Sequence, residues 1–266
     1  MQPRPAATVV LVRDAPEPEP GRGPLQVFLQ RRVAGMAFAG GMTVFPGGSV
    51  DVTDLPDPTA WTGPDPGWWG ERFGHDPELA GALVCAAVRE TFEECGVLLA
   101  GPGRADLTLL VDGRADLVAH RRTLGQVLAG SGLVLRSELL RPWARWITPP
   151  GPSRRYDTAF LVAVVPTGQD ADAHTTEAVE ATWWYPDDAL REWERGGMAL
   201  MPPTYRTLLE IAEHPDSAAL LAAAEHRVIS PITPHMHRDG DDFVVELSGG
   251  ATFRMAAARL AVGGGS

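Results

Sequence analysis

The chain has 266 residues, of which 44% are hydrophobic and 21% charged, an ordinary composition for one large globular domain or two small ones. Its formal net charge is −11 at pH 7, which argues against sequence-independent binding to nucleic acid, where basic side chains must replace the counterions of the phosphates. All 23 basic residues are Arg, so the Lys-dependent sites of Walker A loops, protein kinases and pyridoxal-phosphate enzymes are excluded.

The sequence also favours a cytoplasmic protein without a membrane partner, and its wealth of Ala, Gly, Pro and Arg favours a bacterial source. No apolar run approaches the roughly 20 residues that cross a bilayer, and the N-terminus shows no apolar segment followed by a signal-peptide cleavage site. Cys85 and Cys95 are ten residues apart in one expected helix. Their Cα atoms are then about 15 Å apart, which is too far for a disulfide.

Hydrophobic patterning and turn residues predict the elements of the first half of the chain. Residues 55–77 hold prolines, glycines and three tryptophans and are expected to form an irregular insertion, either a functional loop or a structured cover over the core. The other expected elements are strands over 6–13 and 25–32, a Pro-rich loop over 15–24, a Gly-rich turn over 39–41, a helix over 78–95 that ends at Gly96, and a helix over 115–128.

The second half continues the alternation of strands and helices, which predicts an α/β (α+β) sandwich around a mixed sheet. We expect one domain over 1–200, with the insertion at about 55–77, and a C-terminal extension over 201–266 packed on the same domain. The last six residues, 261–266, are expected to be disordered. The expected elements are strands over 143–148, 156–166 and 179–185, helices over 187–195, 205–214 and 217–226, and a β-rich tail over 228–260.

The stretch RETFEECGV, which begins at Arg89, is the most informative part of the sequence. At 100° per residue, Glu90, Glu93 and Glu94 lie within a 100° arc of the expected helix. Like charges at this spacing repel and raise one another's pKa, unless a hard divalent cation with its preference for oxygen ligands lies there. The alternative is an ordinary solvated acidic face. The opposite, core-facing stripe consists of Val84, Val88, Phe92 and Cys95.

The string R-E-x-x-E-E-x-G closely resembles the core of the Nudix box, G-x5-E-x7-R-E-U-x-E-E-x-G-U, in which U is a bulky aliphatic residue. Thr91 stands at the first U position, which is a departure, whereas Val97 takes the last one. The turn Phe45-Pro46-Gly47-Gly48 is the other half of the resemblance, since it resembles the turn that precedes the box in this superfamily.

The box is interrupted in this chain. A standard box would put its Arg at position 62, whereas Arg89 lies 27 residues later. Gly81 stands in the place of the upstream Glu, and Asp54, six residues after Gly48, is a candidate to replace that Glu. The interrupted box and the flanking segments VFLQRR, WITP and RRYDTAFLVAVVP resemble the Nudix branch that contains the coenzyme A diphosphatases of peroxisomes and mitochondria, over about residues 6 to 210.

This resemblance implies a Nudix-type α/β/α sandwich and an enzyme that uses Mg²⁺ (or Mn²⁺) to hydrolyse a diphosphate bond in a nucleotide-containing small molecule. The first choice of substrate is coenzyme A or acyl-CoA, which would give 3′,5′-ADP and (acyl-)phosphopantetheine. The resemblance implies that the metal ligands are Glu90, Glu93, Glu94 and the carbonyl of Gly48. Glu93 or Glu94 would also be the most economical catalytic base.

Other residues receive supporting roles. Arg89 can orient Glu93, its i,i+4 neighbour, and Glu177 or Glu180 is a candidate base from a later loop. A diphosphate also needs fixed positive charge, for which the planar guanidinium of Arg is suited. The expected substrate-binding residues are Arg31, Arg32, Gly47, Gly48 and Arg155, with Arg154 beside the last of these.

Two alternatives stay open for the function. The same chemistry could act on ADP-ribose, NADH or a nucleoside diphosphate sugar, or the chain could be a Nudix-like ligand-binding regulator without turnover, against which the intact Glu triad argues. The sequence leaves a homodimer open. His235-Met236-His237, followed by Asp239, has metal-ligating residue types, but a surface turn is the favoured interpretation. Trp143, Trp146, Trp183 and Trp184 are expected in the core rather than stacked on a base.

Overall fold

The computed structural model describes residues 2–18, 20–36, 39–101, 107–247 and 252–256. The disorder predicted for 261–266 lies outside these residues. The strands are β1 (Arg4–Asp14), β2 (Leu25–Arg32), β3 (Thr43–Val44), β4 (Gly47–Ser49), β5 (Trp61–Thr62), β6 (Ala100–Gly101), β7 (Val134–Arg136), β8 (Leu140–Ile147), β9 (Tyr156–Val164), β10 (Ala178–Trp184), β11 (Pro231–Ile232), β12 (His235–Asp239), β13 (Asp242–Glu246) and β14 (Thr252–Ala256). The α-helices are α1 (Pro66–Phe73), α2 (Pro77–Cys95), α3 (Leu107–Val118), α4 (Leu124–Gly130), α5 (Pro186–Glu194), α6 (Pro202–Ala212) and α7 (Ser217–Glu225), with short 3₁₀ helices at Pro58–Ala60 and Ser137–Leu139.

A mixed sheet forms the centre of the molecule. Its strand order is β10-β2-β1-β9-β8-β11, with β3 paired to β2 and β4 paired to β1. β1 and β9 run parallel, as do β8 and β11, and the other pairs are antiparallel. Two small sheets, β12-β13-β14 and β5-β7-β6, complete the described strands.

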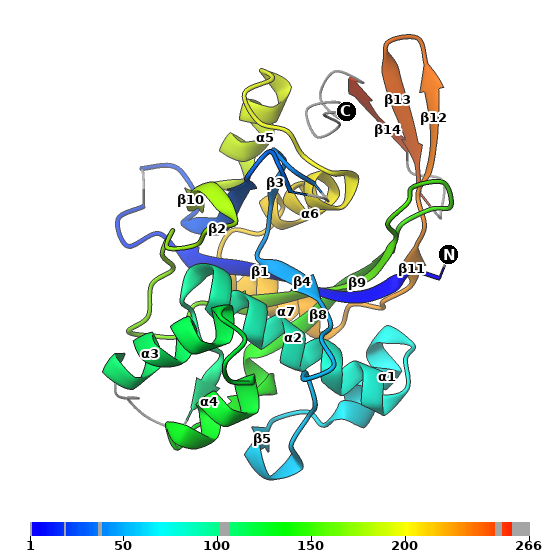
Figure 1. Ribbon diagram of the computed structural model, residues 1–266. Helices are drawn as coiled ribbons and strands as arrows, with labels where there is room; N and C mark the ends of the chain where they lie inside the picture. Colours follow the sequence, from blue (N-terminus) through cyan, green and yellow to red (C-terminus); the bar gives the residue numbers. More distant parts are fainter. Residues whose placement is uncertain (1, 19, 37–38, 102–106, 248–251, 257–266) are drawn as a thin grey trace.

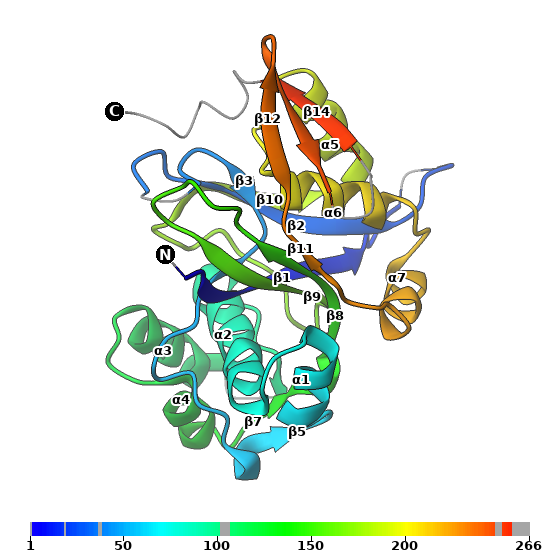
Figure 2. The ribbon, with the colours of Figure 1, turned by 90° about the vertical axis from the view of Figure 1, so that its right-hand side faces the viewer.

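Helices cover both faces of the central sheet, as Figures 1 and 2 show, with α1–α4 on one side and α5 and α6 on the other. Successive side chains of a strand point to opposite faces, and β1 illustrates the result. Val9 and Leu11 belong to the core beneath α2, whereas Val10 and Val12 belong to the core that α5, α6 and α7 share. The predicted α/β/α sandwich around a mixed sheet is confirmed. Among the described residues, no helix has the length and apolarity that crossing a membrane requires.

The insertion predicted as irregular contains a helix. Asp65 caps α1 by accepting a hydrogen bond from the backbone N–H of Trp68, Pro66 follows the cap, and the helix ends at Gly74, whose φ of 68° is left-handed. Trp69 and Phe73 are completely buried and pack against the core on the α2 side. The segment is therefore a structured cover, and the prediction of an irregular segment was wrong because local capping signals were overlooked.

The single helix predicted over 115–128 is two helices, α3 and α4. The chain turns between them at His120, whose φ is +53°. Thr123 then caps α4 in a capping box, in which its hydroxyl accepts from the N–H of Gln126 and the Gln126 side chain accepts from the N–H of Thr123. A Thr followed three residues later by Gln is a start signal for a new helix.

Candidate active site

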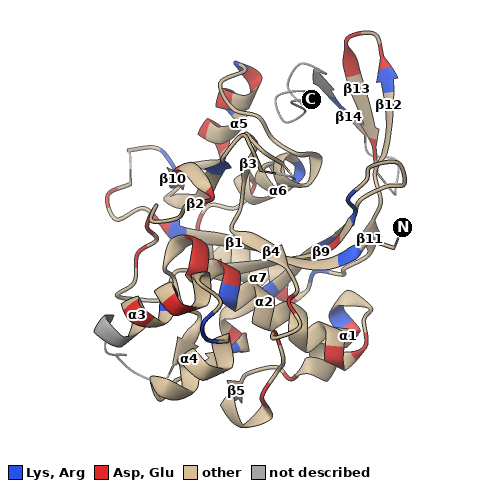
Figure 3. Ribbon diagram, viewed as in Figure 1, with Lys and Arg blue, Asp and Glu red and all other residues tan. Residues whose placement is uncertain are grey.

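Helix α2 carries the acidic face, and clear capping residues mark both of its ends. Asp76 accepts a hydrogen bond of 2.8 Å from the N–H of Leu79, and Pro77 follows as the first helical residue. Gly96 ends the helix with a φ of 74°. The predicted core-facing stripe is buried throughout, and Cys85 and Cys95 are buried free thiols as expected. The stripe turns the opposite face of α2 toward the turn that contains β4, and Figure 3 shows acidic segments along this part of the helix.

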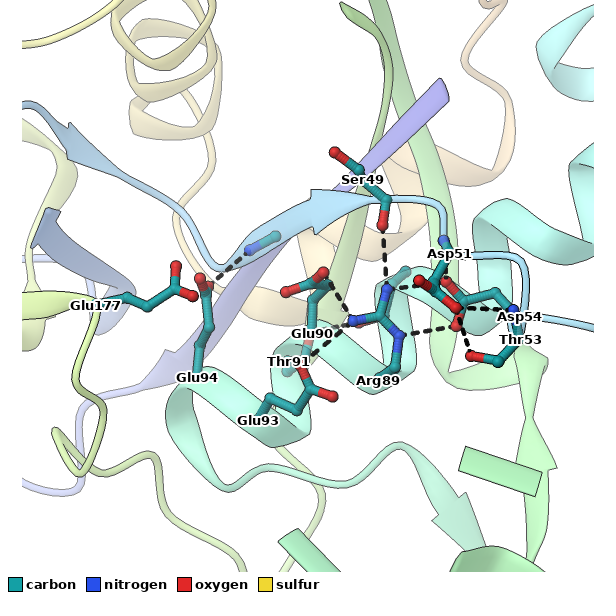
Figure 4. A network of polar contacts seen from close by, with 12 residues as sticks. Ser49, Asp51, Thr53, Asp54, Arg89, Glu90, Thr91, Glu93, Glu94 and Glu177 are labelled. Carbon is teal, nitrogen blue, oxygen red and sulfur yellow. Dashed lines mark hydrogen bonds and ion pairs between the residues drawn. The ribbon is translucent and has the colours of Figure 1, made fainter. Parts of the chain in front are cut away.

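Arg89 is the centre of a polar network between α2 and the turn after β4 (Figure 4). Its Nε and Nη2 donate to the two carboxylate oxygens of Asp54 at 2.8 Å each, and Nη2 also donates to the carbonyl of Ser49 at 3.1 Å. Asp54 is only 1% exposed. Asp54 therefore supplies the fixed carboxylate that orients Arg89. A Glu at position 81 would not fit, because even a Cβ on Gly81 would collide with Pro56.

The remaining nitrogen of Arg89 contacts two of the predicted metal ligands. Nη1 donates to Glu90 at 2.8 Å and to Glu93 at 3.3 Å. Glu90 also lies directly beneath the Gly47-Gly48 turn, because a Cβ placed on Gly48 would collide with the Glu90 carboxylate. Arg89, Glu90, Glu93 and Gly48 all line the same cavity. The structure thus brings these predicted site residues together.

Glu94 lies beside this group rather than in the cavity lining. Its Oε2 accepts from the backbone N–H of Gly47 at 2.8 Å and from the side-chain amide of Gln30. Both bonds end on Oε2, which leaves Oε1 outside them. Gly47 also packs against the backbone of β1, where a Cβ would collide with the Ala7 carbonyl. The hydrogen bond to Glu94 and this packing together fix the position of the turn.

Burial raises the pKa of all three glutamates. For Glu93 the pKa rises to about 7, since burial and the charge of Glu90 outweigh the stabilising effect of Arg89. For Glu94 it rises to about 8, through burial and then the charge of Glu90, against the hydrogen bond from Gly47. The pKa of Glu90 is also raised by burial, with Arg89 opposing and Glu177 adding to the rise. The site therefore favours neutralisation of these charges.

The donor atoms of the site fit a hard divalent cation. Arg89 forms ion pairs with Asp54, Glu90 and Glu93, so full ionisation of these four groups leaves a net charge of −2 (one positive against three negative). The donors that face the Gly47-Gly48 turn are oxygens, which are the ligands that Mg²⁺ and Mn²⁺ prefer. A crowded, buried group of carboxylates with excess negative charge is the environment that such an ion stabilises.

The cavity next to these residues has a volume of about 610 Å³, within the range of sites for drug-sized ligands. Glu90, Glu93 and the β4 turn form part of its lining. Much of the remaining wall is apolar and comes from elements far apart in the sequence, namely Met36, Phe45, Trp146, Ile147, Phe160, Met201, Pro202 and Met236. Trp146 is thus a core tryptophan that also reaches the cavity.

The structure separates the two candidate acids of the later segment. Glu177 lines the cavity and forms an ion pair of 2.9 Å with Arg32, which also lines it. Glu180 instead pairs with Arg31 at 3.3 Å, and neither of these two residues is in the lining. Arg31 and Arg32 were both expected to bind substrate, and the structure places only Arg32 at the cavity, because neighbours on a strand point to opposite faces. Substrate binding by either residue stays a prediction. Figure 4 shows Glu177 directed toward Glu94.

A similar separation occurs before β9. Arg154 lines the cavity, whereas Arg155 does not, because its Nε donates to the carbonyls of Thr148 and Pro149 within the β8–β9 connection. Sequence reasoning named Arg155 for substrate binding, with Arg154 beside it, whereas the structure places Arg154 in the cavity lining. It also missed Arg122 and His120, which reach the cavity from the turn between α3 and α4. The missed capping box at Thr123 was the signal that could have revealed this turn.

Comparisons with known proteins give a consistent result. The family model "NUDT19 Nudix domain" matches residues 76–211. "Putative nudix hydrolase 7" of Caenorhabditis elegans is 29% identical, over 72% of this chain and 57% of that protein, so the matched region spans little more than half of this relative. "Acyl-coenzyme A diphosphatase NUDT19" of Gallus gallus is 30% identical, over 78% of this chain and 68% of that protein. A crystal structure of a Nudix hydrolase from Alicyclobacillus acidocaldarius, 29% identical, covers 86% of this chain and 99% of its own with a TM-score of 0.71.

Proposed function

Because the chain belongs to the Nudix hydrolase family, in the branch of the NUDT19 Nudix domain, we propose that it hydrolyses the diphosphate bond of coenzyme A or acyl-CoA. The products would be 3′,5′-ADP and phosphopantetheine or its acyl derivative. The names of the chicken and human relatives, both acyl-coenzyme A diphosphatases, support this choice of substrate.

One observation carries the proposal: carboxylates held by a fixed guanidinium line a cavity whose remaining wall is largely apolar. The acids suit a cation and a diphosphate. The apolar wall suits a long uncharged group, such as pantetheine with an acyl chain, because burial of apolar surface stabilises the complex.

In this proposal, Glu90, Glu93, Oε1 of Glu94 and the carbonyl of Gly48 would hold Mg²⁺ or Mn²⁺. When bound, such an ion screens the charge of the diphosphate and polarises its P–O bonds. Arg89 acts through the carboxylates, since its contacts to Asp54 and Ser49 hold it in place and its Nη1 holds Glu90 and Glu93 in turn. Arg89 and Asp54 are therefore positioning residues.

We assign the role of general base to Glu177. Glu90 and Glu93 are tied to Arg89, whereas Glu177 faces the same cavity from a different element and forms an ion pair with Arg32. A carboxylate in this position accepts a proton from the attacking water, provided that substrate binding brings the water within hydrogen-bond distance. Arg32, Arg122 and Arg154 line the cavity and would supply the positive charge that a diphosphate and a further phosphate group need.

The substrate proposal is tested with a panel of coenzyme A, acetyl-CoA, a long-chain acyl-CoA, ADP-ribose, NADH and diadenosine polyphosphates, each with Mg²⁺, with products identified by mass. We expect the largest kcat/KM for a coenzyme A derivative and release of 3′,5′-ADP. Preference for ADP-ribose or NADH would replace the substrate but keep the reaction. If Mg²⁺ and Mn²⁺ both gave no turnover on any member while binding was measurable, the chain would be a ligand-binding protein.

The residue assignments are tested with matched neighbours. Glu177→Gln should lower kcat by about 10²- to 10⁴-fold, the usual contribution of general base catalysis, whereas Glu180→Gln, with the same chemistry and a similar Arg partner, should be nearly neutral. Arg154→Ala should raise KM by about tenfold or more, and Arg31→Ala should leave KM unchanged. Equal losses for Glu177→Gln and Glu180→Gln would contradict the assignment of the base.

A further inference from the structure

The small sheet β12-β13-β14 carries two faces of different chemistry. It extends from the body of the molecule on the side of α5 and α6 (Figures 1 and 2). On its inner face, Met236 lies opposite Val245, which lies opposite Phe253, and all three belong to or pack against the core on that side. Strand alternation therefore directs the residues on either side of Met236, which are His235 and His237, to the outer face.

The outer face brings three metal-ligating side chains together. His235 lies directly opposite Glu246 in the register of β12 and β13. Its Nδ1 is 3.4 Å from one carboxylate oxygen of Glu246, and Nδ1 of His237 is 3.8 Å from the other. The imidazole rings of the two histidines are 5.9 Å apart between centroids. The ligand atoms of all three residues lie within 4.8 Å of one another.

These separations suit coordination of one ion. Bonds of about 2.0–2.2 Å in a tetrahedral site place the ligand atoms roughly 3.3–3.5 Å apart. The shortest separation already has this value, and the others need only small rotations of exposed side chains. Within the described part of the chain, this is the one group of three or more His, Cys, Asp or Glu residues whose ligand atoms approach so closely.

We propose that His235, His237 and Glu246 form a binding site for Zn²⁺ or a similar late first-row divalent ion on the outer face of this hairpin. Imidazole ligands favour Zn²⁺, Ni²⁺ and Cu²⁺ over Mg²⁺, so the site differs in chemistry from the all-oxygen donors of α2. The nearby guanidinium of Arg254 does not oppose the ion strongly, since Asp239 holds it at 2.6 Å at the far end of the hairpin.

The ion would act on the wall of the cavity described above. Pro234 and Met236 line that cavity, and Met236 lies between the two histidine ligands on the same strand. Coordination by residues of both β12 and β13 fixes the register of these strands. The bound ion would therefore hold Met236 in place without contacting any substrate, and its loss would loosen one wall of the cavity.

The site is tested on the full chain by isothermal titration with Zn²⁺ in excess Mg²⁺, followed by titration with Ni²⁺ under NMR observation of the histidine side chains. The comparison includes His235→Ala, His237→Ala and Glu246→Gln. His174→Ala is the matched control, because His174 is an exposed histidine beside a single carboxylate, Asp172. Glu93→Gln provides a second control that removes a carboxylate of α2.

We expect one equivalent of Zn²⁺ to bind the wild type, with affinity lowered at least about tenfold in each ligand variant and unchanged in both controls. Substoichiometric Ni²⁺ should broaden the signals of His235 and His237 before those of other histidines. The proposal is overturned if Zn²⁺ binding survives His237→Ala, or if the only Zn²⁺ site disappears in Glu93→Gln. Because the expected binding persists in Glu93→Gln, this result is independent of the proposed hydrolase activity.

Discussion

Replacement of Asp54 by Asn tests whether the buried ion pair with Arg89 holds the site together. The change keeps the shape of the side chain but removes its charge, and one of the two strong hydrogen bonds to Arg89 is lost. Breaking a buried ion pair by removing one partner costs about 3–5 kcal/mol. Arg89 retains Glu90, Glu93 and the carbonyl of Ser49, so we expect the lower end, about 3 kcal/mol of unfolding free energy.

Urea unfolding followed by tryptophan fluorescence measures this loss, since the chain has 8 Trp residues. With a slope of about 3 kcal/mol per molar urea, the midpoint should fall by about 1 M. Hydrolysis should fall by at least about tenfold in the same variant, because Arg89 would then pair more closely with the carboxylates that are proposed to hold the cation.

Asp51→Asn is the matched control for this variant. Asp51 lies three residues away, is exposed, and accepts hydrogen bonds from Thr53 that the Asn oxygen can also accept. Its unfolding free energy should change by no more than about 0.5 kcal/mol. If Asp54→Asn cost no more than this control, the argument that the pair with Arg89 fixes the site would be refuted.

Two further predictions concern the acids and the turn above them. The pKa of Glu94 is raised to about 8, above the ordinary value of 4.5, so the folded protein binds this proton more tightly than the unfolded chain does. Without metal, the stability of the wild type relative to Glu94→Gln should therefore decrease as the pH rises from about 4.5 through about 8. Melting curves over that pH range check this prediction, and an increase in relative stability would contradict it. In the turn, Gly48→Ala forces the flexible end of Glu90 to move, so hydrolysis should fall at least about tenfold with little loss in melting temperature. Gly47→Ala meets the backbone of β1 instead and should lower the melting temperature by several degrees more; equal effects of the two glycine variants on stability would contradict this reading of the turn.

The parts of the structure that follow from local signals could be predicted from the sequence. Helix α2 has an apolar stripe at helical spacing and a glycine at its end, and its acidic face was identified from the same periodicity. The split between α3 and α4 had a local signal as well, the capping box at Thr123, but the prediction of one continuous helix over 115–128 did not take it into account. The covering helix α1 had caps at Asp65 and Gly74 that the prolines and tryptophans around them obscured.

Other features depend on tertiary contacts that no local pattern encodes. The alternation of a strand predicts that only one of Arg31 and Arg32 can face the cavity, but the choice of Arg32 depends on which face of the sheet the cavity adjoins. The place of Arg122 in the cavity depends on how α3 packs on α2. The pairing of Arg89 with Asp54 joins residues 35 positions apart in the chain, and the sequence offered Asp54 as a candidate only through its spacing from Gly48.

The hairpin that supplies Met236 to the cavity has a consequence for how such a protein can diversify. The stretch recognised by the family model ends at residue 211, whereas β12 begins at His235. The acidic residues of α2 and the part of the cavity wall that contains Met236 are thus encoded by separate segments of the sequence. Substitutions in the terminal hairpin can therefore change the size of the molecules that the cavity admits without changing the acidic residues of α2.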